Sequence, residues 1–165
     1  MRHVISLLVD NEAGVLSRVA GLFSGRGYNI ESLSVAPTLD PTRSKMVITT
    51  SGDDQVLEQI KKQLNKLINV IKVVDYTGKE FVEREMLLIK VKAEDKSRAE
   101  VLRIADIFRA KVVDVSHSSY TLELTGNKEK LQGFIDILNP IGIVDFIRTG
   151  VIVMDREMQR RRPLR

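Results

Sequence analysis

The chain has 165 residues, of which 43% are hydrophobic and 29% charged, and it contains no cysteine. This composition indicates one globular domain or two small ones, and it excludes disulfide bonds, thiolate nucleophiles and cysteine metal sites. The net charge of +4 resides in residues 156–165, which hold five arginines and one glutamate, so the rest of the chain is neutral. The basic end predicts a solvated terminal tail, or a tail that docks on an acidic surface.

The first half of the chain alternates between strand and helix patterns. A short apolar run at residues 4–9 is typical of a buried strand. Asp10 and Asn11 follow as candidate N-caps of a helix, which two glycines end after Phe23. The predicted elements in chain order are a strand at 4–9, a helix at 15–23, strands at 30–36 and 46–50, a helix at 56–68 and a strand at 70–76.

The second half repeats the same order. Asn127 is a candidate N-cap of its second helix, and the turn at 117–119 predicts a hairpin between two strands. The predicted elements are a strand at 86–91, a helix at 101–108, strands at 112–115 and 120–124, a helix at 131–138 and a strand at 143–147.

The repeat is also visible in the residues themselves. The segment RVAGLF at 18–23 matches RIADIF at 103–108, an offset of 85 positions. Together with the element order, this predicts an α+β fold of two tandem ferredoxin-like βαββαβ units. The predicted boundaries are 1–77 for the first unit, 78–80 for a linker, 81–154 for the second unit and 155–165 for the basic tail.

Gly14 is the residue that this repeat does not explain. Glycine costs a helix about 1 kcal/mol relative to alanine, and the offset places Ala99 at the matching position of the second unit. We therefore predict that Gly14 serves a task of the first unit alone. A helix N-terminus binds anions, and Asn11 both donates and accepts hydrogen bonds, so a free amino acid fits this loop. A glycine required only by a turn remains the alternative, and the same holds for Asn29 as a turn residue.

The stretch LLVDNEAGVLSRVAGLFSGRGYNIESLSVAPT closely resembles the small regulatory subunit family of acetolactate synthase (acetohydroxyacid synthase). The resemblance continues through VLEQIKKQLNKL and VDYTGKEFVEREMLLIKV to GVIVMDRE, and so covers essentially the whole chain. It implies that the first unit is an ACT domain, a module that binds small amino acids. It also implies a homodimer in which valine binds between two ACT domains.

The resemblance further implies which residues bind the effector and which protein the chain regulates. One chain is expected to supply the loop and helix start, and its partner the start of a strand: Asn11, Glu12, Ala13, Gly14, Val15 and Leu16 from the first, Asn29 and Ile30 from the second. The family activates a large catalytic subunit, which holds thiamine diphosphate, Mg and FAD, and confers feedback inhibition by valine. The small subunit itself is expected to hold no cofactor and no metal and to be no enzyme.

The residues give less support to other functions. The only histidines, His3 and His117, belong to no recognised catalytic motif. RNA-binding modules of this strand order carry aromatic residues on their central strands, which residues 3–10 and 45–51 lack, so no nucleic-acid partner is expected. No apolar stretch is long enough for a membrane span or a signal peptide, which predicts a cytoplasmic protein. A stand-alone amino-acid sensor that regulates another partner remains the alternative.

Overall fold

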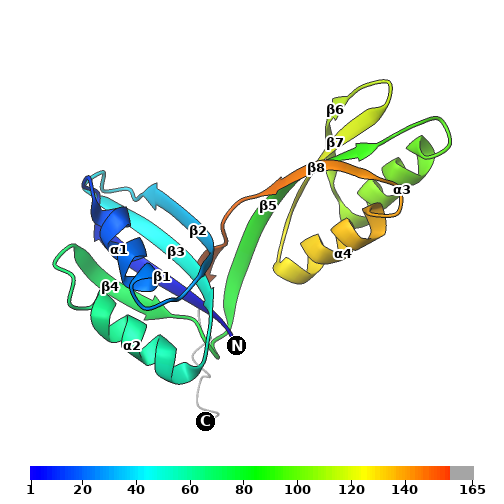
Figure 1. The fold of residues 1–165 in the computed structure, drawn as a ribbon. Helices are drawn as coiled ribbons and strands as arrows, with labels where there is room; N and C mark the ends of the chain where they lie inside the picture. The colour runs from blue at the N-terminus through cyan, green and yellow to red at the C-terminus, as the bar shows by residue number, and fades with distance from the viewer. Residues whose placement is uncertain (157–165) are drawn as a thin grey trace, which may run out of the picture. The chain divides into compact units, whose positions relative to one another are not determined.

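The computed structural model describes residues 1–156, which form two compact units (Figure 1). Each unit has helices on one face of an antiparallel sheet, and each follows the predicted element order. The prediction of an α+β fold with two ferredoxin-like units is confirmed. No helix among residues 1–156 is long and apolar enough to cross a membrane.

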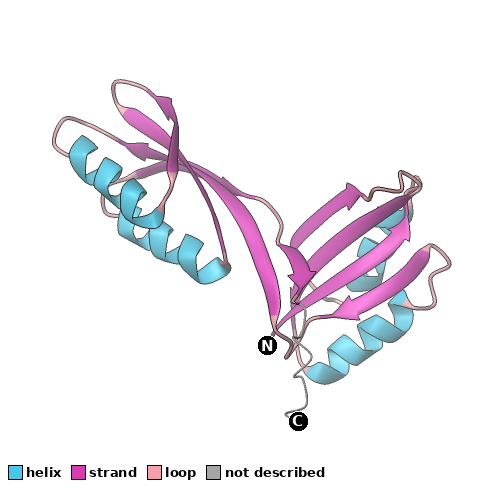
Figure 2. Ribbon diagram, turned by 180° about the vertical axis from the view of Figure 1, so that it is seen from behind, coloured by secondary structure: helices cyan, strands magenta, loops and turns pink. Residues whose placement is uncertain are grey.

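The first unit is a four-stranded sheet in the order β2-β3-β1-β4, and Figure 2 shows it from the face without helices. The central strand β1 pairs antiparallel with β3 and β4 along most of its length. The predicted strand at 46–50 is longer in the structure. The elements are β1 (Arg2–Asp10), α1 (Val15–Ser24), β2 (Ile30–Pro37), β3 (Arg43–Ser51), α2 (Asp54–Leu64) and β4 (Val70–Asp75).

The core of the first unit follows from the period of two in its strands. Side chains alternate between the two faces of a strand, so every second residue of β1 and β3 is directed to one face. Both helices add apolar residues at helical spacing. The buried apolar side chains include Ile5, Leu7 and Val9 of β1, Met46 and Ile48 of β3, Val15, Val19 and Phe23 of α1, and Leu57, Ile60 and Leu64 of α2.

The second unit has the strand order β6-β7-β5-β8, and a further strand, β9, pairs with β5. Asn127 caps α4 as predicted, because its side chain accepts a hydrogen bond from the Lys130 N–H at 3.1 Å. The elements are β5 (Phe81–Lys92), α3 (Arg98–Phe108), β6 (Lys111–Val115), β7 (Ser119–Gly126), α4 (Lys128–Leu138), β8 (Ile143–Arg148) and β9 (Ile152–Asp155).

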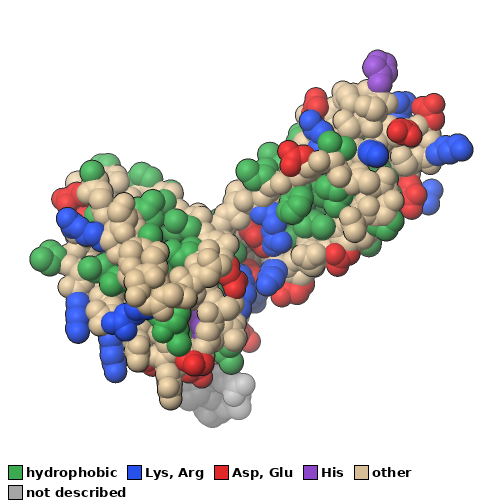
Figure 3. Space-filling model, viewed as in Figure 1, with side chains coloured by type: hydrophobic (Ala, Val, Ile, Leu, Met, Phe, Trp, Pro, Cys, Tyr) green, Lys and Arg blue, Asp and Glu red, His purple; other side chains and the backbone are tan. Residues whose placement is uncertain are grey.

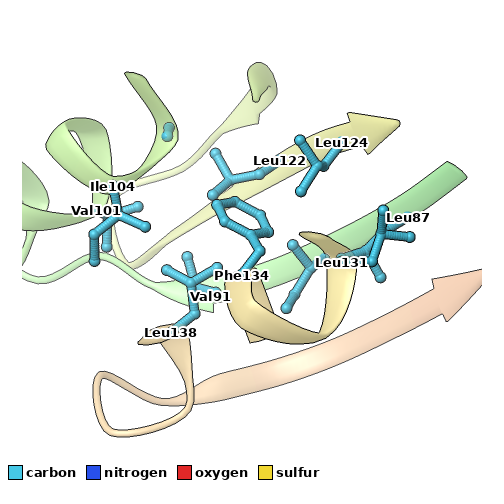
Figure 4. Packing of buried hydrophobic residues seen from close by; sticks show 11 residues of the cluster. Leu87, Val91, Val101, Ile104, Leu122, Leu124, Leu131, Phe134 and Leu138 are labelled. Carbon is cyan, nitrogen blue, oxygen red and sulfur yellow. The ribbon is translucent and has the colours of Figure 1, made fainter. Parts of the chain in front are cut away.

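Phe134 of α4 lies at the centre of the second core. Its ring points from the helix toward the strands, among Leu122, Leu131 and Val91 (Figure 4). It also packs against Phe108 of α3, with ring centroids 5.1 Å apart. This one side chain therefore joins both helices to the sheet.

The boundary between the units is less simple than a single linker. Residues 77–80 form the turn that leads into β5, but Phe81 and Val82 group with the first unit. Residues 153–156, of which the predicted boundary placed 153 and 154 in the second unit, also group with the first. Of the predicted tail, 155–165, only Asp155 and Arg156 lie within the described residues.

His3 and Asp75 connect the start of β1 to the turn after β4. The buried His3 ring lies 3.0 Å from the Gly52 carbonyl through Nε2 and 3.0 Å from Thr77 Oγ1 through Nδ1. Since a carbonyl only accepts, Nε2 is the donor. The Thr77 N–H donates to Asp75 at 2.8 Å, and Lys61 of α2 lies 3.2 Å from the same carboxylate. These contacts give His3 a structural role.

The pKa of Asp75 predicts how this network responds to acid. Burial raises the pKa of Asp75, but hydrogen bonds from Thr77 and Lys61 outweigh burial and hold it below its ordinary value. A depressed folded-state pKa stabilises the fold above the unfolded pKa, about 3.9, and this stabilisation disappears as the pH falls through the folded value.

Asp75→Asn should therefore lower the free energy of unfolding by about 1 kcal/mol at neutral pH. The difference from the wild type should shrink once the pH falls below about 4. Urea unfolding at a series of pH values measures it. A difference that stays constant down to the acid-unfolding limit would contradict the assigned role of the ionised carboxylate.

Candidate functional site

The helix after the β1–α1 loop starts at the predicted residue, but its N-cap is not the predicted one. We predicted Asp10 or Asn11 as the N-cap, but α1 starts at Val15 and Gly14 is its N-cap. Asn11 instead ties the loop to the segment before β3: its side chain donates to the Pro41 carbonyl at 2.9 Å and its N–H to the Thr42 carbonyl at 2.8 Å. The loop is thus held at its base, and Gly14 is left at the helix start.

Gly14 adopts a left-handed backbone conformation, with φ +86°. Side chains other than glycine, asparagine and aspartate rarely adopt it. The comparison with Ala99 therefore does not hold, because α3 begins at Arg98 and places Ala99 inside the helix. The second unit starts its helix two positions earlier than the repeat offset implies. Gly14 has a conformational reason for being glycine, and a Cβ built there meets nothing within 4 Å.

The N-terminus of α1 differs electrostatically from those of the other helices. The first turns of α2, α3 and α4 each contain an acidic residue, whereas that of α1 contains none. The side chains of Asp53 and Asn127 cap α2 and α4, but Gly14 has no side chain with which to cap α1. The partial positive charge of α1 is therefore available to an external anion. Leu16, 42% exposed, adds an apolar side chain next to it.

Asn69, in the turn before β4, holds the charged side chains around this loop. Its amide nitrogen donates to Asp10 at 3.2 Å and to Glu12 at 3.4 Å, and its amide oxygen accepts from Arg18 of α1. Its backbone carbonyl also accepts the Asp10 N–H at 2.9 Å. The two carboxylates that flank the helix start are thus directed toward Asn69.

Asn29 and Ile30 lie at the other end of α1. Asn29 is exposed just before β2, and its carbonyl accepts a hydrogen bond from Thr50 of β3 at 2.8 Å. The ten residues of α1 separate it from Gly14, a rise of about 15 Å. The structure therefore brings Asn11–Leu16 together at one end of α1 and Asn29–Ile30 at the other. Within one chain the two sets form no common site.

Comparison with known proteins gives matches along nearly the whole chain. Residues 5–72 match the model of the small-subunit ACT domain of acetohydroxyacid synthase, and residues 84–157 match the model of the small subunit of acetolactate synthase. The acetolactate synthase small subunit of Haemophilus influenzae is 51% identical over 157 residues, covering 94% of this chain and 96% of that protein. The isozyme 3 small subunit of Escherichia coli is 50% identical over the same shares.

A solved structure also matches this chain along nearly its whole length. The crystal structure of the acetolactate synthase small subunit from Thermotoga maritima superposes with a TM-score of 0.86 at 40% identity, covering 94% of this chain and 98% of that one. The chain belongs to the acetolactate synthase small-subunit family. The family resemblance found in the sequence is confirmed, and so is the ACT domain at its start. Small-subunit membership implies a large catalytic subunit as partner.

Two residues of this small subunit's loop were missed by the sequence analysis. Asn69 and Arg18 shape the surroundings of Gly14, but they lie 51 positions apart. Arg18 belongs to the repeated helix segment and was assigned to the common fold. Asn69 lies between the predicted helix at 56–68 and the predicted strand at 70–76, where it had no assigned role. No local pattern pairs them, because their contact exists only once β4 lies beside β1.

Asn69→Ala should loosen the loop of the small subunit. Loss of its side-chain hydrogen bonds should lower the free energy of unfolding by about 1 kcal/mol and speed amide exchange at residues 11–16. Hydrogen exchange with mass spectrometry measures the second effect. Asn65→Ala, which removes an exposed asparagine at the end of α2, is the matched control. Unchanged exchange at residues 11–16 would show that Asn69 does not hold the loop.

Proposed function

We propose that this chain is the non-catalytic regulatory subunit of acetolactate synthase, which activates the large catalytic subunit and confers feedback inhibition by valine. In this proposal it acts in the cytoplasm, as a homodimer, in branched-chain amino acid biosynthesis. It carries no cofactor of its own, and the catalytic partner holds thiamine diphosphate, Mg and FAD. The observation that carries the proposal is the match of two small-subunit family models along nearly the whole chain, together with the uncapped start of α1.

Valine suits the start of α1 for physical reasons. Its carboxylate complements the free N–H groups and the positive end of the helix dipole at Gly14. Its apolar side chain complements the exposed Leu16. Its ammonium group needs acceptors, and a side-chain amide such as that of Asn29 offers one.

The position of Asn29 favours a site shared by two chains. In one chain Asn29 and Gly14 stand at opposite ends of α1. A two-fold axis perpendicular to α1 places the Gly14 end of one chain beside the Asn29 end of its partner. Such a dimer has two equivalent sites, each made from Asn11–Leu16 of one chain and Asn29–Ile30 of the other.

Calorimetric titration of the purified dimer with valine tests the proposal directly. We expect saturable binding with one valine per chain, together with inhibition of the reconstituted holoenzyme over the same concentrations. A small subunit that activates the catalytic subunit but binds no valine would contradict the effector assignment. One that binds valine but leaves acetolactate formation unchanged would instead support a stand-alone sensor.

Gly14→Asp should abolish valine binding while the protein stays folded. Aspartate tolerates the left-handed backbone at a cost of about 1 kcal/mol, and its Cβ has open space. Its carboxylate would occupy the anion site and repel the carboxylate of valine. Calorimetry measures the binding, and thermal unfolding checks the fold.

Two variants separate charge from backbone strain. Gly78 has φ +72° and equally open space around its Cβ, so Gly78→Asp carries the same backbone cost away from the site and should bind valine normally. Gly14→Asn is nearly isosteric with Gly14→Asp but uncharged, and should bind valine more tightly than Gly14→Asp. Equal valine affinity in Gly14→Asp and the wild type would refute the site.

Asn29→Ala should give a holoenzyme that is activated but insensitive to valine. The substitution keeps the backbone carbonyl that accepts from Thr50, so the fold is maintained. Activation requires contact with the catalytic subunit, whereas inhibition requires the filled effector site, and the two are linked only by a coupling free energy. Acetolactate formation with and without valine measures both. Loss of activation and inhibition together in a folded dimer would contradict this separation.

A further inference from the structure

A hollow lies on the helix-free face of the first sheet, which is the face that Figure 2 presents. Its volume is about 220 Å³, and all of its lining residues belong to the first unit. At about 30 Å³ per water molecule, it has room for roughly seven waters or a small organic molecule. The lining residues are Ser6, Leu8, Lys45, Lys72, Val74, Tyr76 and Asp155.

The strand register explains why two lysines meet at this hollow. Leu8 of β1 stands directly opposite Lys45 of β3 on one side and directly opposite Lys72 of β4 on the other. The three residues therefore share one face, with the lysine Cα atoms two strand spacings apart, about 9.6 Å. Both lysine side chains are long enough to converge on a single anion above Leu8.

The polar groups of this face are not used by the fold. Within the described residues, neither Lys45 nor Lys72 has an ion-pair partner, and Ser6 has no side-chain hydrogen bond although it is only 3% exposed. The Ser6 hydroxyl can therefore donate a hydrogen bond to a molecule in the hollow. Figure 3 shows the opposite side of this unit, where positive and negative side chains lie among hydrophobic ones.

The other end of the hollow carries the opposite charge. Tyr76 and Asp155 both line this end, and burial, reinforced by the Asp155 carboxylate, raises the pKa of Tyr76, so the hydroxyl keeps its proton. Lys72, Val74 and Tyr76 follow one another at every second position of the same edge, so the Cα atoms of Lys72 and Tyr76 lie about 13 Å apart. A ligand with a second anionic group at this end would be repelled by Asp155.

We propose that the hollow binds a small organic monocarboxylate. Its carboxylate lies between Lys45 and Lys72 and accepts a hydrogen bond from Ser6, while its aliphatic body covers Leu8 and Val74. The site is separate from the effector site at Gly14, which lies at the start of α1. It does not rest on the proposed regulation by valine.

Titration with 4-methylpentanoate at neutral pH, followed by NMR of the methyl groups, tests the proposal in the full-length protein. We expect saturable shifts at the methyl groups of Leu8 and Val74, which valine does not displace. The neutral analogue 4-methylpentanamide and the dianion glutarate should bind more weakly.

Charge-matched variants assign the effect to the two lysines. Lys45→Gln and Lys72→Gln should each weaken binding of 4-methylpentanoate by about tenfold. Lys66→Gln, which removes an exposed lysine beyond the end of α2, should leave it unchanged. These variants should stay folded, because the side chains removed are exposed and make no ion pair within the described chain.

Three results would overturn the proposal. The first is the absence of saturable shifts at Leu8 and Val74. The second is that inorganic phosphate binds as tightly as 4-methylpentanoate. The site would then bind simple anions without using the apolar side chains of Leu8 and Val74. The third is loss of association with the catalytic subunit in the lysine variants without any binding of 4-methylpentanoate, which would assign this face to protein docking.

Discussion

The alternation of side chains along β1 is the constraint on which the first unit depends. β1 is hydrogen-bonded on both sides, to β3 and to β4, so its register cannot shift without breaking two ladders. With Ile5, Leu7 and Val9 fixed in the core, Ser6 and Leu8 must face the other side. The register then places Lys45 and Lys72 beside Leu8 and carries Asp10 to the loop that precedes α1. The register of β1 therefore determines which residues form the core, which line the hollow and which begin the loop.

Much of this architecture could be predicted from the sequence, because its signals are local. The period of two in β1, the helical spacing from Val15 to Phe23 and the cap at Asn127 each depend on neighbouring residues. The same is true of the repeat, which identified two similar units. The prediction was wrong at the cap of α1, where Asn11 is drawn away by the Pro41 carbonyl. This hydrogen bond joins residues 30 positions apart, so local helix propensity could not predict it.

The candidate site was predictable only in part, for the same reason. Gly14 stood out as a glycine at a helix start, but its left-handed conformation and its open surroundings became visible only in the structure. Asn69 reaches the loop from β4's turn, and Lys45 meets Lys72 only across Leu8. These groups of residues come together from separate strands. The order of the strands in the sheet cannot be read from neighbouring residues in the sequence. The role proposed for Asn29 depends on a second chain, which the sequence of one chain cannot position.

The length of α1 has a consequence for mixtures of variants. In the proposed dimer each chain carries two half-sites about 15 Å apart, one around Gly14 and one around Asn29. In a two-fold dimer of a chain damaged at Gly14 with a chain damaged at Asn29, both lesions fall in one site and the other site is intact. Two variants that are each inactive in valine binding would therefore complement one another, and the stoichiometry of the mixed dimer would fall to half. Such complementation is a property of shared sites that no monomeric sensor of the same fold possesses.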